Sequence, residues 1–388
     1  MSAALSGTSN LSSRTLRILA IEPYFGGPHA DFLEGLRAHS RHQWTLLTMP
    51  ARRWRWRMHG GAIHLAREAA ALAARPGAGK NAGGPFDLIF ASDFLNVAEF
   101  KGLAPEAVAR LPVVTYFHEN QLSYPLEPGQ RRDPHYAFIN LSTCQASREI
   151  WFNSAFHRDA WYAALRGLLA KMPDSVPEGL VDGLLARSRV MPPGMDLSPF
   201  RPARTRERRP PLTVLWNHRW EFDKNPEAFF EVLFFLAQED VPFRLAVVGE
   251  ATRKWPAVFE KARKVLADRL VRFGYLPDRA AYEAEVRRSD IVVSTAFHEF
   301  FGLPVVEAIA AGCFPLMPAR LSYPEIIPAA WHETFFYQTE RELRVKLTSL
   351  LKGKGPWDRA FKLSEHVQAY DWTNCIRAYD EALERAAS

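Results

Sequence analysis

Two glutamates near residue 300 have the spacing and surroundings of a site that binds hydroxyl groups and phosphate together. Glu299 and Glu307 are separated by seven residues, and between them come Phe301, Gly302 and Leu303. The carboxylates can accept hydrogen bonds from hydroxyl groups. The backbone N–H groups of residues 301–303 would lie at a helix N-terminus, where anions are favoured. A nucleotide sugar offers both kinds of group.

The elements that would position these residues are a strand and a helix. Residues 291–294 predict a buried strand that leads into the loop carrying Glu299. Pro304 is tolerated in a first helical turn, residues 308–311 are good helix formers, and Gly312 would end the helix. An ordinary strand, loop and helix with two unrelated glutamates would also give the spacing alone.

The chain opens with a pattern typical of a doubly wound α/β domain. A buried strand is predicted over residues 16–21, followed by Gly26 and Gly27 and then a helix over residues 30–38. The two glycines would let the backbone approach a phosphate or an acceptor closely. A plain tight turn explains them equally well, and the sequence lacks the G-x-G-x-x-G pattern of dinucleotide sites.

A dense alternation of arginine and tryptophan follows the second predicted strand, residues 44–48. Guanidinium groups can bind phosphates, and indole faces can stack on unpaired bases. We therefore interpret this stretch as a contact to RNA or a nucleotide, with a solvated basic loop as the alternative. Its members are Arg52, Arg53, Trp54, Arg55, Trp56 and Arg57.

Polar residues follow a further predicted strand at residues 112–117. His118, Asn120 and Gln121 come directly after it. Loops at the carboxyl ends of parallel strands are where open α/β sheets bind ligands. We therefore expect His118 to face a binding site, although a lone histidine is more often structural.

Composition excludes several classes of protein. The three cysteines among 388 residues show no C-x-x-C spacing, which argues against a disulfide framework or a zinc site. No apolar run approaches a membrane span, and the first residues lack the apolar segment of a secretion signal. These features predict a cytoplasmic protein. The net charge of +6 suits a polyanionic partner such as RNA.

Two α/β domains are predicted, with breaks rich in proline, glycine and charge. Residues 1–14 would be a disordered tail, residues 15–201 a first Rossmann-like domain, 202–211 a linker, and 212–367 a second Rossmann-like domain. A terminal helix within residues 368–388 completes the chain. Residues 76–85 resemble a phosphate loop only faintly, because Lys80 is followed by asparagine, and they predict a surface loop.

The glutamate pair with Phe-Gly-Leu-Pro inside it resembles the donor-site signature of retaining GT-B glycosyltransferases. The first domain is more distinctive: residues 22–29, 50–57, 117–121 and 124–125 resemble the tRNA-queuosine alpha-mannosyltransferases. The resemblance implies a GT-B fold whose last helix crosses back to the first domain. It also implies mannose transfer from GDP-mannose to the cyclopentene-diol of queuosine in the anticodon loop of tRNA-Asp.

The same resemblance implies roles for individual residues. Arg219 and Lys224, on the loop after a strand predicted at residues 212–217, would bind the donor diphosphate and neutralise its growing charge. Glu307 would hold the ribose and Glu299 the sugar, and His118 would orient the sugar or the acceptor. The nucleobase wall would be Gly274, Tyr275 and Leu276. Because no D-x-D motif occurs, neither a metal nor another cofactor is expected.

Two other functions stay open on the sequence alone. One is a GT-B glycosyltransferase acting on a lipid or polysaccharide, with Trp54 and Trp56 on a membrane surface. The other is a non-catalytic module that binds tRNA or nucleotide sugars. Residue types and spacing leave open the donor sugar and base, the catalytic base, domain closure and the oligomeric state.

Overall fold

The structure is a computed structural model that describes residues 14–75, 85–127, 129–202, 208–251 and 256–388. Almost all of the predicted N-terminal tail and of the predicted surface loop at residues 76–85 lies outside these ranges, as does the centre of the predicted linker. Everything below concerns the described residues.

Two six-stranded sheets form the framework, and every strand pairing resolved in detail is parallel. The first has the order β2-β1-β3-β4-β5-β6 and the second β12-β11-β10-β7-β8-β9. This confirms the predicted α/β fold. The strands are β1 Arg17–Phe25, β2 Gln43–Pro50, β3 Leu88–Ser92, β4 Val113–Phe117, β5 Glu149–Phe152, β6 Ser188–Val190, β7 Leu212–Trp216, β8 Phe243–Val248, β9 Leu270–Gly274, β10 Ile291–Val293, β11 Phe314–Pro318 and β12 Phe336–Tyr337.

Helices occupy most of the connections between strands. The seven α-helices that precede β7 are α1 Pro28–His39, α2 Trp54–Ala73, α3 Val97–Leu103, α4 Glu106–Ala109, α5 Pro134–Ala146, α6 Ala155–Leu169 and α7 Leu180–Ala186. Those that follow are α8 Pro226–Gln238, α9 Val258–Val265, α10 Arg279–Arg288, α11 Leu303–Ala310, α12 Tyr323–Ile326, α13 His332–Phe335, α14 Glu340–Leu351, α15 Trp357–His366 and α16 Trp372–Ala387. Helix α2 was not predicted from the sequence, and its first turn contains the second part of the arginine–tryptophan stretch, residues 54–57.

The chain separates into two compact units. Unit 1 contains Met1–Thr115, Ser142–Glu149 and Ile376–Ser388, and unit 2 contains Tyr116–Leu141 and Ile150–Cys375. The predicted division at residues 201 and 212 stays a prediction.

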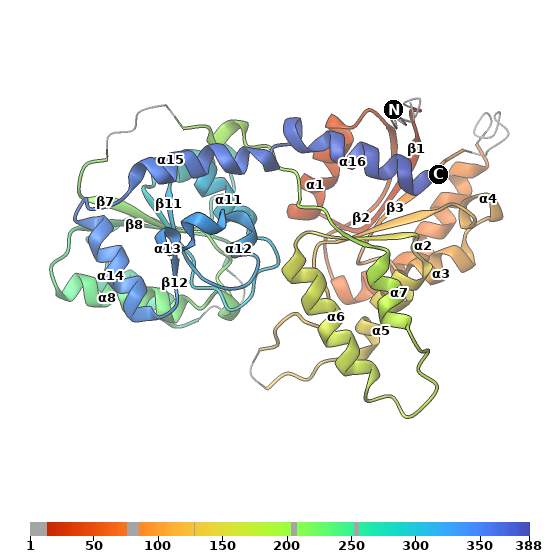
Figure 1. The fold of residues 1–388 in the computed structure, drawn as a ribbon, viewed down its shortest axis with the longest axis horizontal. Coiled ribbons are helices and arrows are strands. Elements are labelled where there is room, and N and C mark those ends of the chain that lie inside the picture. The colour runs from red at the N-terminus through yellow and green to blue at the C-terminus, as the bar shows by residue number, and fades with distance from the viewer. Residues whose placement is uncertain (1–13, 76–84, 128, 203–207, 252–255) are drawn as a thin grey trace, which may run out of the picture. The chain divides into compact units, whose positions relative to one another are not determined.

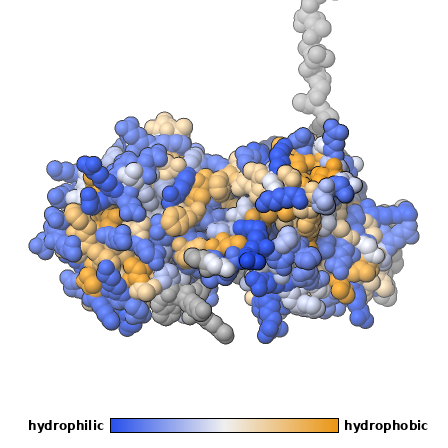
Figure 2. Space-filling model, turned by 90° about the horizontal axis from the view of Figure 1, so that it is seen from below, coloured by the Kyte–Doolittle hydropathy of each residue, from blue (hydrophilic) through white to orange (hydrophobic). Residues whose placement is uncertain are grey.

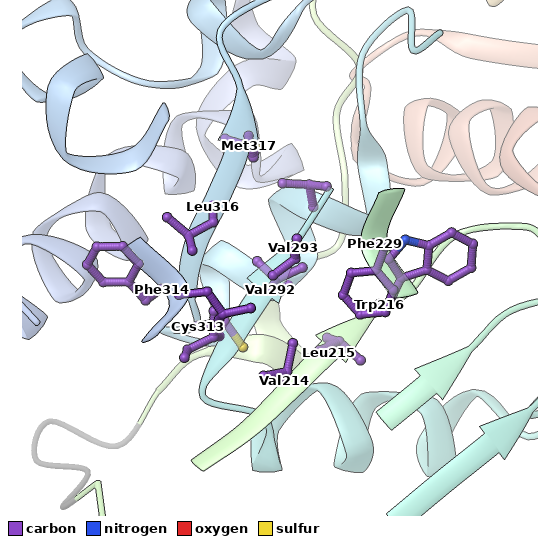
Figure 3. Packing of buried hydrophobic residues seen from close by; sticks show 14 of the residues in the cluster. Val214, Leu215, Trp216, Phe229, Val292, Val293, Cys313, Phe314, Leu316 and Met317 are labelled. Atoms are coloured by element: carbon purple, nitrogen blue, oxygen red, sulfur yellow. The ribbon is translucent and has the colours of Figure 1, made fainter. Parts of the chain in front are cut away.

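The core of unit 2 is built on the second sheet. Trp216 on β7, Val293 on β10 and Leu316 on β11 are fully buried, and Figure 3 shows them packed with their neighbours from adjacent strands. These strands are continuous apolar runs because helices cover both faces of a parallel sheet. Figure 1 shows α15 on one side of this sheet and α8 with α14 on the other. The buried strands fix the positions from which the site loops emerge.

The last helix, α16, begins in unit 2 and continues in unit 1, which confirms the predicted crossing back. Its Asp380 accepts hydrogen bonds from Ser40 Oγ at 2.5 Å and from the Arg41 backbone N–H at 3.1 Å. His42 Nε2 lies 3.8 Å from the same carboxylate. A single buried carboxylate thereby anchors the helix to the turn between α1 and β2.

Among the described residues, no helix is both long and apolar enough to cross a membrane. Figure 2 shows one face, on which hydrophobic residues form separate patches among hydrophilic ones.

Replacing Asp380 by alanine is expected to lower the free energy of unfolding by about 1–3 kcal/mol, because partly buried donors at Ser40 and Arg41 lose a charged acceptor. Chemical denaturation monitored by circular dichroism measures the change. The control is Glu381→Ala, since the Glu381 side chain is 43% exposed and forms an ion pair with Arg377 one turn earlier on the same helix. Equal effects of the two substitutions would contradict the anchoring role.

Candidate functional site

The site is built from two loops that leave neighbouring strands, β7 and β10. The strand order reverses between them, since β8 and β9 lie beyond β7 while β11 and β12 lie beyond β10. Ligands of open α/β sheets bind outside the carboxyl ends of the strands at such a point. The loop after β7 carries Arg219 and Lys224, and the loop after β10 carries Glu299. The fold therefore brings the predicted cations and one predicted carboxylate together.

Backbone hydrogen bonds hold these two loops against each other. The carbonyl of Asp223 accepts from the N–H of Phe297 at 2.7 Å and of His298 at 3.3 Å. The Thr295 hydroxyl donates to the carbonyls of Lys224 and Asn225 at 3.0 and 2.8 Å. The loop geometry is thus fixed before any ligand is considered.

Lys224 lies at the centre of the site, with a side chain that is 7% exposed. Its Nζ donates to the His298 carbonyl at 2.8 Å and lies 3.3 Å from Glu299 Oε2 and 3.0 Å from Asp223 Oδ2. A buried ammonium is costly unless it is paired. Here the two carboxylates outweigh the burial and raise the pKa of Lys224. The lysine therefore keeps its charge across the physiological range.

Glu299 is ionised for the reciprocal reason. Burial opposes ionisation, but the adjacent Lys224 charge outweighs it and lowers the pKa of Glu299 below its usual value. An ionised carboxylate only accepts hydrogen bonds. Glu299 is therefore suited to hold hydroxyl groups.

Two buried histidines flank this ion cluster. Burial, reinforced by the charge of Lys224, lowers the pKa of His218 and of His298 from 6.5 to about 4. Both imidazoles are therefore neutral near pH 7. They add no positive charge beside Lys224.

Glu307 lies one turn into α11, as predicted, with a side chain that is 10% exposed. Arg279 Nη2 donates to its Oε1 and the Tyr282 hydroxyl to its Oε2, both at 2.6 Å. Both partners come from α10. Neither contact was predicted from the sequence, because no local motif in α10 marks Arg279 or Tyr282.

The turn between the glutamates has the predicted form. Gly302 has a φ of 101° and precedes α11, which carries Pro304 in its first turn. A Cβ on Gly302 would lie 3.0 Å from the ring of Tyr323. Glycine is thus required by both conformation and space. The first N–H groups of an α-helix have no partner within the helix. Pro304, in the first turn of α11, has no N–H group at all.

Arg219 is half-exposed, unlike Lys224. Its Nη2 donates to the Tyr124 hydroxyl at 3.2 Å and lies 3.4 Å from Glu221. Tyr124 also lies against the ring of His298, with centroids 4.7 Å apart. In the sequence, Tyr124 stands out only as part of the motif at residues 124–125. Its contact with Arg219 could not be read from the sequence, because 95 positions separate the two residues.

The loop after β4 contains three of the predicted residues. His118 is half-buried, and its carbonyl accepts from Asn153 Nδ2 at 2.9 Å. Asn120 is fully buried, and its Oδ1 accepts from the N–H groups of Leu122 and Ser123. Its amide shapes the loop, so we leave it out of the proposed acceptor contacts.

Gln121 and the predicted nucleobase wall are more exposed than Asn120. Gln121 is half-buried and donates to Glu119 at 2.7 Å. At the end of β9, Gly274 has a φ of 121°, Tyr275 is 61% exposed, and Leu276 is half-buried against the core. An exposed ring at a strand end is compatible with base stacking.

The remaining predicted residues belong to unit 1. Gly26 closely approaches Ala51, because a Cβ on Gly26 would lie 2.6 Å from that side chain. Gly27 has a φ of 51° and precedes α1. Both glycines are therefore required by the turn itself, which explains them without a ligand.

The arginines of the arginine–tryptophan stretch differ in their exposure to solvent. Arg52, Arg53 and Arg55 are exposed, whereas Arg57 is buried and its guanidinium donates to the Pro50 carbonyl at 3.2 Å. The contact of Arg57 with RNA stays a prediction, and the guanidinium is directed to the end of β2. We keep only the exposed arginines for the proposed surface.

The two tryptophans also differ. Trp54 is half-buried and meets Phe94 edge-on, with Arg55 over its ring at 5.3 Å. Trp56 is 61% exposed. A Cβ on Gly60 would lie 2.6 Å from the Trp56 ring, so the indole rests on that glycine.

Comparison with known proteins decides the family. Residues 17–195 match the family described as tRNA-queuosine alpha-mannosyltransferase N-terminal, and residues 200–367 match glycosyl transferases group 1. The chain is 33% identical over 339 residues to the tRNA-queuosine alpha-mannosyltransferase of Drosophila melanogaster, covering 85% of each chain. This chain belongs to the tRNA-queuosine alpha-mannosyltransferase family. It is a glycosyltransferase, as the resemblance implies.

Two further comparisons fit this family. A GDP-mannose:cellobiosyl-diphosphopolyprenol alpha-mannosyltransferase of Xanthomonas campestris is 25% identical over 188 residues, 47% of each chain. The structure of sucrose-phosphate synthase from Thermosynechococcus elongatus has a TM-score of 0.68 at 14% identity, covering 96% of this chain and 100% of that one. At that identity the second likeness shows the fold alone, and it confirms the GT-B architecture of this mannosyltransferase family member.

The depressed histidine pKa values predict a loss of stability in acid. Between pH 6.5 and about 4, His298 is protonated in the unfolded chain but neutral in the folded chain. Folding stability therefore falls as the pH falls through this window, by about 3 kcal/mol at most for one such histidine. Urea denaturation at a series of pH values should show a shallower loss in His298→Gln than in the wild type. The control is His59→Gln on the surface of α2, and an unchanged slope in His298→Gln would contradict the assignment.

Proposed function

We propose that this protein transfers mannose from GDP-mannose to the cyclopentene-diol of queuosine in tRNA-Asp, with retention of configuration. The observation that carries the proposal is the buried ion cluster of Lys224 with Glu299, in a chain related over most of its length to the Drosophila enzyme. The cluster supplies charge for a diphosphate and an acceptor for sugar hydroxyls. We also propose that the protein works in the cytoplasm, where its tRNA substrate is found.

The donor would bind at the carboxyl ends of β7 and β10. The diphosphate would lie against Arg219, Lys224 and the backbone of residues 302–304, with Glu307 on the ribose and Glu299 on the mannose. The base would pack near Gly274, Tyr275 and Leu276. The Xanthomonas relative, whose name includes GDP-mannose, supports the choice of donor.

Transfer would proceed on one face of the sugar. The acceptor oxygen bonds to the anomeric carbon as the bond from that carbon to the diphosphate breaks, and the departing phosphate oxygen takes the acceptor proton. Negative charge therefore grows on the diphosphate. Lys224 is fixed by three contacts and needs no reorganisation to stabilise that charge. His118 would orient the sugar or the acceptor. We propose that the two cations make a metal ion unnecessary.

The acceptor would be held by the exposed part of the arginine–tryptophan stretch. Arg52, Arg53 and Arg55 offer charge for phosphates, and Trp56 offers an exposed indole face for an unpaired base. Gly60 supports this role because the absence of a side chain there lets the indole of Trp56 lie directly against the helix backbone. Gln121 stays a candidate for a further acceptor contact.

The function is tested by incubating the protein with GDP-mannose and tRNA-Asp, with and without queuosine, followed by nucleoside mass analysis. The proposal expects one added hexose on queuosine only. UDP-glucose and UDP-galactose serve as alternative donors. Hexose transfer only to a lipid acceptor, or only from another sugar nucleotide, would contradict the proposal.

Replacing Lys224 by alanine should reduce kcat by roughly 10²–10³-fold, since a positioned charge on the leaving group is lost. Single-turnover transfer kinetics measure the effect, and circular dichroism verifies folding. Lys261→Ala, which removes an exposed lysine from α9 in the same unit, is the matched control. Near-normal turnover by a folded Lys224→Ala variant would remove this residue from the mechanism.

Replacing Trp56 by alanine should weaken tRNA binding by about tenfold, the effect of losing one stacked base, and leave the affinity for GDP unchanged. Filter binding at several salt concentrations measures both affinity and its salt dependence. Ile63→Ala removes an exposed apolar side chain from the same helix and should have little effect. Unchanged binding by Trp56→Ala, or a flat salt dependence of the wild type, would argue against this surface as the RNA contact.

A further inference from the structure

Glu307 is held by a directed chain of hydrogen bonds that begins at the backbone. Asn217, the residue directly after β7, donates from Nδ2 to the Pro304 carbonyl at 2.8 Å and to the Tyr282 hydroxyl at 3.2 Å. The Tyr282 hydroxyl in turn donates to Glu307 Oε2 at 2.6 Å. The chain links the loop after β7, helix α10 and helix α11.

The direction of each bond follows from the first one. A carbonyl oxygen only accepts, so the side of the Asn217 amide that faces Pro304 must be its nitrogen. That nitrogen also lies next to the Tyr282 oxygen, which must therefore accept from it. The single proton of the Tyr282 hydroxyl is then directed to Glu307. Because the donor and the acceptor of each hydrogen bond are determined in this way, the Glu307 carboxylate has one preferred orientation.

Arg279 stabilises the ionised form of the Glu307 carboxylate. Its Nη2 lies 2.6 Å from Glu307 Oε1, opposite the oxygen that Tyr282 contacts. A guanidinium stays protonated in proteins, and it offsets the cost of a carboxylate that is only 10% exposed. Arg279 also lies over the rings of Phe200 and Tyr282, which restrict its position. Tyr282 stays a neutral donor because burial and the adjacent Glu307 charge raise its pKa.

We propose that Asn217, Tyr282 and Arg279 are positioning residues that orient ionised Glu307 to read the ribose hydroxyls of the donor nucleotide. A carboxylate fixed in this way accepts from the vicinal 2′ and 3′ hydroxyl groups and does not donate. A site built to bond a hydroxyl rejects an analogue that lacks it. The protein should therefore distinguish ribonucleotides from deoxyribonucleotides. The inference rests on the proposed function for the placement of the donor ribose at Glu307.

The test compares dissociation constants for GDP, 2′-deoxy-GDP and 3′-deoxy-GDP, measured by calorimetry. The wild type should bind each deoxynucleotide about tenfold more weakly than GDP, as expected for a lost hydrogen bond to a charged group. Tyr282→Phe should bind GDP about tenfold more weakly and lose most of the difference between GDP and its deoxy analogues. A general packing defect would weaken all three ligands alike and keep their ratio.

Three further variants serve as controls for this comparison. Tyr162→Phe on α6 removes a hydroxyl that bonds to Ser188 at the start of β6, which is not among the proposed donor contacts, and should keep the wild-type ratio. Arg279→Gln should lose the discrimination, and Arg279→Lys, which restores the charge, should recover part of it. Thermal unfolding verifies that each variant is folded.

The outcomes separate this inference from the proposed function. Equal binding of GDP and both deoxynucleotides by the wild type would overturn the inference, as would a folded Tyr282→Phe variant with the wild-type ratio. Neither result depends on mannose transfer. Ribose-dependent binding of GDP without transfer to queuosine would instead sustain the inference and contradict the proposed function.

Discussion

A buried ammonium group, Lys224, is the constraint around which the site is organised. Taking an ammonium out of water is costly, and the cost is offset only when opposite charges lie close on several sides. Asp223 supplies one such charge from the same loop and Glu299 the other from the loop after β10. Because β7 and β10 are neighbours in the sheet, the two loops start close together and the ion cluster fastens them. Pairing within the cluster explains why Lys224 stays protonated and Glu299 stays ionised in surroundings that would neutralise either one alone.

The two cations of the site have different surroundings, and this suggests a division of labour. The side chain of Arg219 is 53% exposed and can meet an incoming anion in solvent. Lys224, at 7% exposed, acts where the dielectric constant is lower and each interaction is stronger. Glu307 has a separate counter-charge in Arg279, so ribose recognition does not draw on the cations proposed for the diphosphate. Each of the two carboxylates thus has its own counter-charge, and Arg219 and Lys224 are the two cations proposed for phosphate.

Local patterns in the sequence predicted the parts of this structure that depend on neighbours along the chain. The strand predicted at residues 212–217 is observed as β7 with its end one residue earlier, and Gly302 and Pro304 were placed correctly at the start of α11. Helix α2 was missed because Gly60 and Gly61 lower its helix propensity, and the arginine–tryptophan run before them has no apolar periodicity. Contacts between distant residues could not be predicted either. Tyr282 and Arg279 meet Glu307 from another helix, and an isolated tyrosine or arginine in α10 gives no sign of its partner.

The central claim is that the fixed charge of Lys224 stabilises the diphosphate as it departs. The most direct test measures single-turnover rates with GDP-mannose analogues in which the oxygen between the two phosphorus atoms is replaced by CH₂ or CF₂. This replacement changes the acidity of the leaving group and keeps the bond that breaks. The account predicts a weak dependence of the rate on this acidity in the wild type and a much steeper one in Lys224→Ala. Equal slopes in the two proteins would contradict it, because the lysine would then have no share in the charge that develops on the leaving group.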